Sequence, residues 1–375
     1  MLFRECFQHL VNIERKRIVT PDNVVMRLNR GEQPTELPFD LQRAIRVALG
    51  QQGNTIQQYP SYQQFYQKLA KHIAFPVKQI VVGAGIEEFI RTLMFLCCDP
   101  GQKAAVLWPT CAMYDIYAEA FGVNLIRIKP KPGEKLSVHE LLMQVPADVR
   151  VLFIPNPGQP VETYFDPNEL DEIAQACTRW HMVLAVDEAH YGFGAKTALP
   201  LVAKYPNVIV MRTFSKFYAA ASARVGFVVA QPQVAKMLHA VRPSGEVTGP
   251  SMAVVEVLMS WHMTLQIRAR QIVEARNWLR QAILLEGYRA WGHYGFSVLI
   301  ELNSIEQMQF VVSSLATVGI YVKGNFPEPV ERCILVACGR QALMQDFFDA
   351  FRQVIKGQRD NVKERVRVSG TPQPV

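Results

Sequence analysis

The stretch Arg212-Thr-Phe-Ser-Lys-Phe-Tyr-Ala-Ala-Ala-Ser-Ala-Arg-Val-Gly226 decides how the rest of the sequence is interpreted. Lys216 lies between an apolar strand, residues 208–211, and a run of small residues. An amine in such surroundings is poorly solvated, so it loses its proton more readily and becomes a nucleophile for aldehydes. Residues 219–223 are small enough to let the backbone approach a flat ligand, and Arg224 offers a fork of donors that suits a phosphate.

A hydroxyl, an amine and a guanidinium at this spacing suit pyridoxal 5'-phosphate (PLP), which carries an aldehyde at one end and a phosphate at the other. Ser215, Lys216 and Arg224 are the residues concerned. A tightly packed turn that binds nothing would use the same small residues. The local motif alone does not decide between these two interpretations.

The wider sequence favours the cofactor. The stretch resembles the R-T-F-S-K-x-x-x-x-A-x-x-R-x-G segment of fold-type I PLP enzymes, in particular the histidinol-phosphate aminotransferase-like branch of the class I and II aminotransferases. Further motifs of that branch follow in the same order along almost the whole chain. The resemblance implies that Lys216 forms the covalent link to PLP and moves the proton during transamination, and that Ser215 and Arg224 bind the phosphate.

Composition sets wider limits. A chain of 375 residues predicts two domains, and 49% apolar with 19% charged residues is ordinary for a soluble globular protein. The net charge of +7 is scattered, so no nucleic-acid partner is expected. Seven cysteines show no metal spacing, no apolar run is long enough to span a membrane, and the N-terminus lacks a signal-peptide core. We expect a cytoplasmic protein without a metal.

Further candidate ligand-binding groups follow or end two of the predicted strands. Residues 79–90 predict a strand, a glycine turn and a helix start, and the resemblance assigns phosphate binding there to the backbone amides of Gly85, Ile86 and Glu87. A dinucleotide-binding turn would need a third glycine where Glu88 stands. Residues 182–187 predict a strand that ends in an acid, at the edge where parallel sheets bind ligands.

The resemblance gives that acid, Asp187, the task of keeping the pyridine nitrogen of PLP protonated. A helix cap is the alternative role for this carboxylate. His190 stands where the family has a tyrosine that bonds the phenolic oxygen of PLP, and an imidazole can make the same bond. A partly buried histidine with no ligand is the alternative for His190.

The chain departs from the family pattern at three more positions. Cys111 occupies the place of the tyrosine that stacks on the pyridine ring, unless Trp108 or Tyr114 supplies that ring. Gln159 replaces the asparagine that bonds the phenolic oxygen, with Asn156 as the second candidate donor. In the last strand, Leu335 stands where the family has the arginine that binds the substrate's alpha-carboxylate, so we expect a non-standard substrate anchor; the basic candidates are Lys323, Arg332 and Arg340.

Tyr59 is similar to the family tyrosine that reaches across a dimer to the neighbour's phosphate, and a buried tyrosine at a helix start is its alternative role. The resemblance therefore implies a homodimer. We expect an arm and part of a small domain over residues 1–50, a large three-layer α/β/α PLP-binding domain with a mostly parallel sheet over 51–250, and a connecting helix and small α/β domain over 251–375.

Transamination between a small-molecule amine and an oxo acid is the expected activity. A PLP-dependent decarboxylase, lyase or racemase of the same fold is the first alternative, because one electron sink serves all of these reactions. A non-catalytic partner protein with the PLP fold is the alternative from another class. The presence of Lys216, Asp187 and Arg224 together favours an enzyme.

Overall fold

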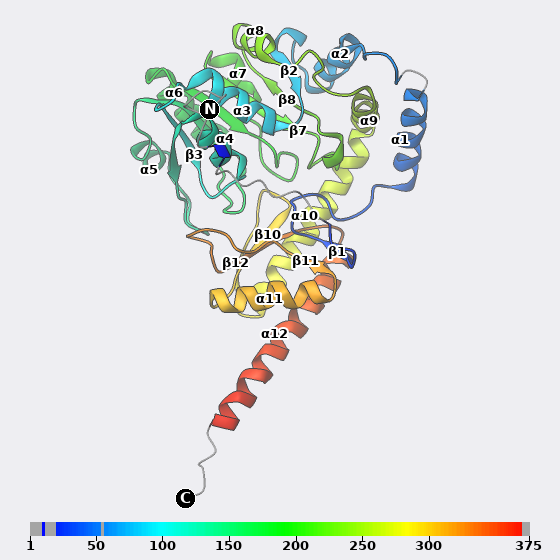
Figure 1. Cartoon of the computed structure of the whole chain (residues 1–375), viewed down its shortest axis with the longest axis vertical. Helices are drawn as coiled ribbons and strands as arrows, with labels where there is room; N and C mark the ends of the chain where they lie inside the picture. Colours follow the sequence, from blue (N-terminus) through cyan, green and yellow to red (C-terminus); the bar gives the residue numbers. More distant parts are fainter. Residues whose placement is uncertain (1–9, 12–19, 54–55, 370–375) are drawn as a thin grey trace, which may run out of the picture. The chain divides into compact units, whose positions relative to one another are not determined.

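The computed structural model describes residues 10–11, 20–53 and 56–369, with side chains to residue 357. The N-terminal arm expected over residues 1–20 falls almost entirely outside this range. The chain divides into two compact units, drawn in Figure 1. The large unit comprises residues 1–18, 36–270 and 293–295, and the small unit comprises 19–35, 271–292 and 296–375.

A seven-stranded sheet forms the centre of the large unit. Its strand order is β2-β8-β7-β6-β5-β3-β4, and all neighbours are parallel except β8, which runs antiparallel to both β2 and β7. The strands are β2 (Ile80–Gly83), β3 (Lys103–Leu107), β4 (Asn124–Ile128), β5 (Val149–Pro155), β6 (Val183–Asp187), β7 (Val208–Thr213) and β8 (Gly226–Val229). The predicted, mostly parallel sheet is therefore confirmed.

Helices cover both faces of this sheet because the crossovers run in two directions. The step from β3 through α4 (Met113–Phe121) to β4 moves one way along the strand order, whereas α5 (Val138–Met143), α6 (Pro167–Arg179) and α7 (Leu199–Lys204) connect strands in the opposite direction. Since such crossovers are right-handed, α4 lies on one face and the other three helices lie on the other. Helix α3 (Ile86–Cys97) packs on α4 and shares its face (Figure 1).

The layer between α3, α4 and the sheet holds an apolar core. Parallel strands buried on both faces read as continuous hydrophobic runs, and β5 does so with every residue buried except Arg150. Burying each large apolar side chain stabilises the fold by roughly 1.5–3 kcal/mol. The core residues include Phe89, Leu93, Val106, Phe153, Met211 and Val228.

The large unit is completed by α1 (Phe39–Gln52), α2 (Tyr62–Ile73), α8 (Pro232–Val241) and α9 (Gly249–Ser260). Helix α9 packs on both α1 and α2. The connecting helix expected at the start of residues 251–375 is divided into two helices. Helix α9 ends at Ser260, and α10 (His262–Leu285) follows after Trp261, whose φ of −98° and ψ of 21° are not helical. Helix α10 continues into the small unit.

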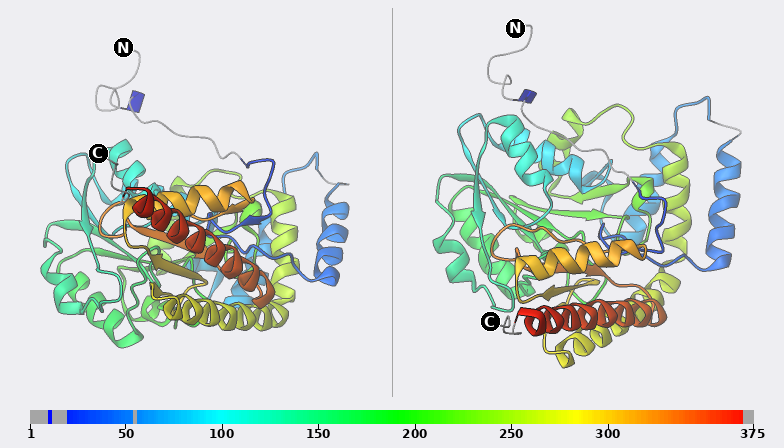
Figure 2. Two further views of the ribbon diagram at one scale, coloured as in Figure 1. Left: turned by 90° about the horizontal axis from the view of Figure 1, so that it is seen from below. Right: turned by 60° about the horizontal axis from the view of Figure 1, so that its bottom comes forward.

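The small unit contains an antiparallel sheet of order β12-β10-β9 and a parallel pair, β1-β11. The strands are β1 (Met26–Arg27), β9 (Arg289–Trp291), β10 (Ser297–Glu301), β11 (Ile320–Tyr321) and β12 (Cys333–Ala337). Helices α11 (Ile305–Thr317) and α12 (Gln341–Ser369) lie side by side, as Figure 2 shows in orange and red. Among the described residues, no helix is long and apolar enough to cross a membrane, and no acidic, histidine or cysteine side chains gather as metal ligands.

Candidate active site

The sheet of the large unit brings most of the predicted site residues to one edge. Strands β2, β3, β5, β6 and β7 run in the same direction, so their carboxyl ends meet at that edge. Antiparallel β8 begins there, since Gly226 pairs with both Gly83 and Thr213. The turns that follow these strands carry the candidates, and this edge is where open α/β sheets bind ligands.

Asp187 ends β6 as a buried carboxylate with two donors. The hydroxyl of Tyr114 donates to its Oδ2 over 2.8 Å, and the backbone N–H of Ala189 donates to its Oδ1 over 2.9 Å. Burial raises the pKa of Asp187 to about 6, against the effect of these two hydrogen bonds and of the charge on Lys216. The carboxyl group is therefore mostly ionised at neutral pH.

His190 lies three residues beyond Asp187. Burial lowers the pKa of His190 to about 3, and the positive charge of Lys216 lowers it further. The imidazole is consequently neutral at physiological pH, so one ring nitrogen donates and the other accepts. Asp187 pairs with Met211 at the ends of the neighbouring strands β6 and β7, and His190 and Lys216 follow these two strands, so the three side chains come from adjacent strand ends.

Arg224 and the start of α3 form a cradle for an anion. The guanidinium lies 3.5 Å from Ser215 Oγ and 3.6 Å from the carboxylate of Glu87. Gly85, with φ of 86°, precedes the helix, and a Cβ at this position would come within 2.9 Å of Arg224 Nη2. The backbone N–H of Gly85 donates to Gly83 O over 2.8 Å, whereas the amides of Ile86 and Glu87 begin a twelve-residue helix, and such amides favour a phosphate.

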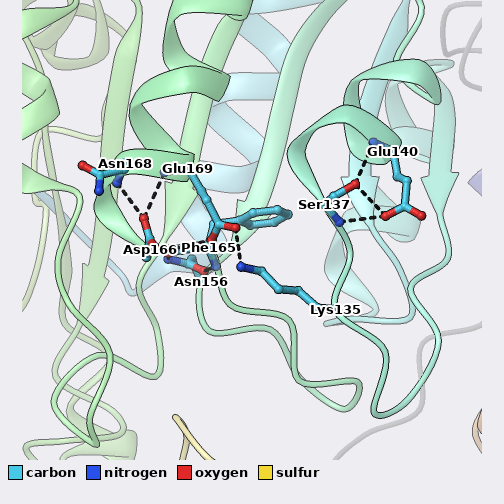
Figure 3. A network of polar contacts seen from close by, with 8 residues as sticks. All are labelled: Lys135, Ser137, Glu140, Asn156, Phe165, Asp166, Asn168 and Glu169. Atoms are coloured by element: carbon cyan, nitrogen blue, oxygen red, sulfur yellow. Dashed lines mark hydrogen bonds and ion pairs between the residues drawn. The ribbon is translucent and has the colours of Figure 1, made fainter.

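The two candidate amide donors after β5 make different contacts, and Figure 3 shows one of them, Asn156, beside Phe165. Asn156 is buried; its Oδ1 accepts from Phe165 N over 2.8 Å and its Nδ2 donates to Phe165 O over 3.0 Å. The oxygen and one amide hydrogen of Asn156 therefore close the turn. Gln159 Nε2 lies beside Gly295, where a Cβ would come within 2.5 Å of it.

The same turn leads into α6 through a capping box. Asp166 accepts from the N–H groups of Asn168 and Glu169, and Glu169 accepts from the N–H of Asp166 and from Lys135 (Figure 3). Such caps are each worth about 1 kcal/mol. They hold the residues that follow β5 in one conformation.

The two rings considered as substitutes for the stacking tyrosine, Trp108 and Tyr114, both contact other residues. Cys111 is exposed. Trp108 is turned toward α4, because its indole N–H donates to Asp115 over 3.0 Å and the amine of Lys129 lies 5.4 Å from its ring. Tyr114 is fully buried with its hydroxyl on Asp187. Both rings considered from the sequence are thus engaged elsewhere.

Sequence reasoning missed a second buried pair behind the site. Glu188, completely buried, accepts from Arg212 Nε over 2.8 Å, and Thr197 donates to the same carboxylate over 2.9 Å. Arg212 also donates to Thr197 over 2.7 Å, and its guanidinium lies 3.8 Å from the ring of Tyr191. The sequence did contain a signal for this pair. Glu188 directly follows Asp187 at the end of β6, and Arg212 lies near the end of the neighbouring strand β7, shortly before Lys216.

Two candidates do not belong to the group at the strand ends. Tyr59 precedes α2 and is 98% exposed in the single chain. Leu335 lies in β12 of the small unit, where it pairs with Leu299 of β10 and forms an antiparallel bridge with Lys323.

A comparison with protein families matches residues 23–351 to the model for "Aminotransferase class I and II". The chain belongs to the class I and II aminotransferases. This aminotransferase is 27% identical to histidinol-phosphate aminotransferase 1 of Trichormus variabilis over 72% of its own length and 75% of the relative's. It is also 27% identical to the aromatic amino acid aminotransferase of Mycobacteroides abscessus, over 66% and 72% of the two chains.

The fold of the aminotransferase is that of a solved PLP complex. The structure of histidinol-phosphate aminotransferase from Sinorhizobium meliloti with pyridoxal-5'-phosphate has a TM-score of 0.84, with 20% sequence identity over 95% of this chain and 99% of the other. Family and fold together make PLP the cofactor. The residues present fit PLP: a buried acid, an amine, and a helix start beside a guanidinium that suits the phosphate.

We predict that Arg212→Ala lowers the free energy of unfolding by about 3 kcal/mol, because the charge of Glu188 would remain buried without its partner. Urea unfolding followed by circular dichroism measures the change. Lys204→Ala is the matched control, since its partner Asp171 lies at the surface and such pairs contribute about 1 kcal/mol or less. Equal losses in the two variants would contradict a structural role for the buried pair.

Proposed function

We propose that this aminotransferase moves an amino group between an amino donor and an oxo acceptor with the side chain of Lys216 as its catalytic base. The observation that carries the proposal is that an amine, a buried carboxylate and an imidazole follow or end two paired strands, β6 and β7, at the same edge of the sheet. PLP, when bound, supplies an aldehyde that reacts with amines and a ring that accepts the electron pair released from the substrate's alpha carbon.

Each side chain has a separate task in this proposal. Lys216 Nζ would hold the cofactor through its aldehyde, and would accept the proton of the substrate's alpha carbon and return it. The carboxylate of Asp187 stabilises a proton on the ring nitrogen. His190 donates to the phenolic oxygen, and Gln159 is the second donor candidate because the amide of Asn156 closes its own turn. Ser215, Arg224 and the amides of Ile86 and Glu87 would bind the phosphate, because the Gly85 N–H already donates to Gly83 O.

We predict that Lys216→Ala lowers the rate of amino transfer by about 10³-fold, as expected for loss of the group that moves the proton. Borohydride treatment of the PLP-loaded wild type should add the cofactor's mass to the peptide containing residue 216, and the variant should lack that adduct. Lys236→Ala, on the exposed face of α8, is the control and should retain both. Release of carbon dioxide from the donor without formation of the pyridoxamine form would instead support a decarboxylase.

The small unit suggests how an anionic substrate is anchored without the family's arginine. Leu335 exchanges two backbone hydrogen bonds with Lys323, over 3.1 and 2.7 Å. Residues paired in this way carry their side chains on the same face of the sheet. Arg332 is bound to Glu301 over 2.5 Å, which engages it in another contact. We propose Lys323 as the cation that takes the arginine's role, because it is paired with Leu335 on the same face; its amine lies 5.2 Å from the ring of Phe326.

We predict that Lys323→Ala raises KM for a carboxylate or phosphate substrate by about 10- to 100-fold and changes kcat little, because a charge-assisted hydrogen bond is worth about 1.5–3 kcal/mol. Steady-state kinetics with the best donor measures this split. Adding Leu335→Arg to that variant should recover much of the affinity. Arg332→Ala is the control with unchanged KM; a rise in KM there, but not in Lys323→Ala, would refute the assignment.

We further propose that the aminotransferase is a homodimer in which Tyr59 binds the phosphate held by the partner. Several large apolar side chains are exposed on the large unit: Phe39 and Val47 on α1, Ile56 and Tyr59 before α2, and Met263 and Ile267 on α10. A groove of about 820 Å³ also runs between α1, α2 and α9. Exposed apolar side chains gathered on neighbouring helices are typical of an interface between protein chains.

We predict that Tyr59→Phe weakens PLP binding by about tenfold, the cost of a lost hydrogen bond to a charged group. Mixing this variant with Lys216→Ala tests whether Tyr59 acts on the partner. Reassorted dimers should recover about a quarter of wild-type activity at limiting PLP, since half of the dimers are mixed and each contains one intact site. The mixed sample must first be shown by sedimentation to contain dimers that have exchanged chains. If such a sample recovers no activity, Tyr59 acts within its own chain or does not bind the phosphate.

A further inference from the structure

We propose that Tyr114 is a positioning residue for Asp187: its hydroxyl holds the carboxylate in one orientation and in its ionised form. The inference deepens the proposed function, because it concerns the acid assigned to the ring nitrogen. The sequence offers Tyr114 only as a ring that stacks on the cofactor, and its bond to a carboxylate 73 residues away arises from the fold alone.

The position of the Tyr114 hydroxyl is fixed by its surroundings. The residue lies in the first turn of α4, and its backbone N–H donates to Cys111 O over 3.2 Å. Its ring is fully buried and meets the edge of Phe153 of β5 with 5.1 Å between the ring centres. Because close-packed interiors leave a buried ring little freedom, the hydroxyl has one place to donate, the Oδ2 of Asp187.

Tyr114 remains a donor across the physiological range. Burial raises its pKa well above the ordinary value, and the charges of Asp187 and Cys111 raise it further. A hydroxyl that keeps its proton can only donate to an ionised carboxylate, so this contact favours the charged form of Asp187. The N–H of Ala189 occupies the other oxygen, which leaves the carboxylate plane fixed while each oxygen retains a lone pair for a further donor.

Three other effects act on the same carboxylate. Burial is the largest and raises the pKa of Asp187, the neighbouring charge of Glu188 also raises it, and Lys216 lowers it. Since Glu188 is itself bound to Arg212, its contribution does not change when Tyr114 is altered. Removing the hydroxyl therefore tests one contact in an otherwise constant environment.

The test uses the full-length chain freed of PLP, in four forms: wild type, Tyr114→Phe, Asp187→Asn and the double variant. The pKa of Asp187 is about 6 in the folded chain, above the ordinary value that it has in the unfolded chain. The free energy of unfolding therefore falls as the pH rises between these two values, and it stays at the lower level at higher pH. Tyr114→Phe should move the upper end of this fall about one pH unit higher. Asp187→Asn should remove the step, and Tyr114→Phe should then have no pH-dependent effect.

Tyr205→Phe is the matched control, because its hydroxyl donates to Asp171 over 3.0 Å near the surface and should leave the step in place. If Tyr114→Phe does not fold, the double variant decides. A folded double variant supports the contact, because Asp187→Asn removes the buried charge that would otherwise lack the Tyr114 donor. An unmoved step in Tyr114→Phe, or the same pH-dependent effect of this change with and without Asp187→Asn, overturns the proposal.

Titration of the same four proteins with PLP separates this inference from the proposed function. Failure of every form to bind PLP would count against the function while leaving the stability result valid. Normal PLP binding with an unmoved stability step would count against Tyr114 alone. The supporting result is a moved step together with a visible PLP band whose pH dependence differs between wild type and Tyr114→Phe.

Discussion

The site depends on one buried charge. Asp187 ends the central strand β6, where burial opposes its ionisation, yet the proposed chemistry needs a carboxylate there. A charge in such a place is tolerated only when donors surround it. The Tyr114 hydroxyl and the Ala189 N–H supply them, so α4 and the turn after β6 are bound to the reacting centre rather than merely packed beside it.

The second buried carboxylate has a different purpose. Glu188 follows Asp187 directly, and its bonds to Arg212 and Thr197 join the ends of β6 and β7 to the loop between them. Lys216 lies four residues beyond Arg212. A rigid connection at this point fixes the segment that carries the amine relative to the strand that carries the acid. Catalytic groups need such support, because small displacements cost large factors in rate.

Two departures from the family pattern, Cys111 and Leu335, fall at positions for which the resemblance implies contact with ligand. Cys111 is exposed, and Leu335 pairs with Leu299 inside the sheet of the small unit. The phosphate cradle around Gly85 and Arg224 retains its close approach between backbone and guanidinium. This distribution fits a family member that keeps the cofactor chemistry and binds its substrate by other contacts.

The sequence by itself determined the class of fold and the main polar groups. Apolar runs ending in Gly83, Asp187 and Met211 predicted strands of a mostly parallel sheet, and the segment around Lys216 predicted the cofactor, because short motifs with fixed spacing encode local geometry. It did not determine which side chains meet across long separations. The Tyr114–Asp187 contact, the Glu188–Arg212 pair, the use of Asn156 to close its turn and the break at Trp261 depend on how strands align and helices pack, and only the tertiary structure decided them.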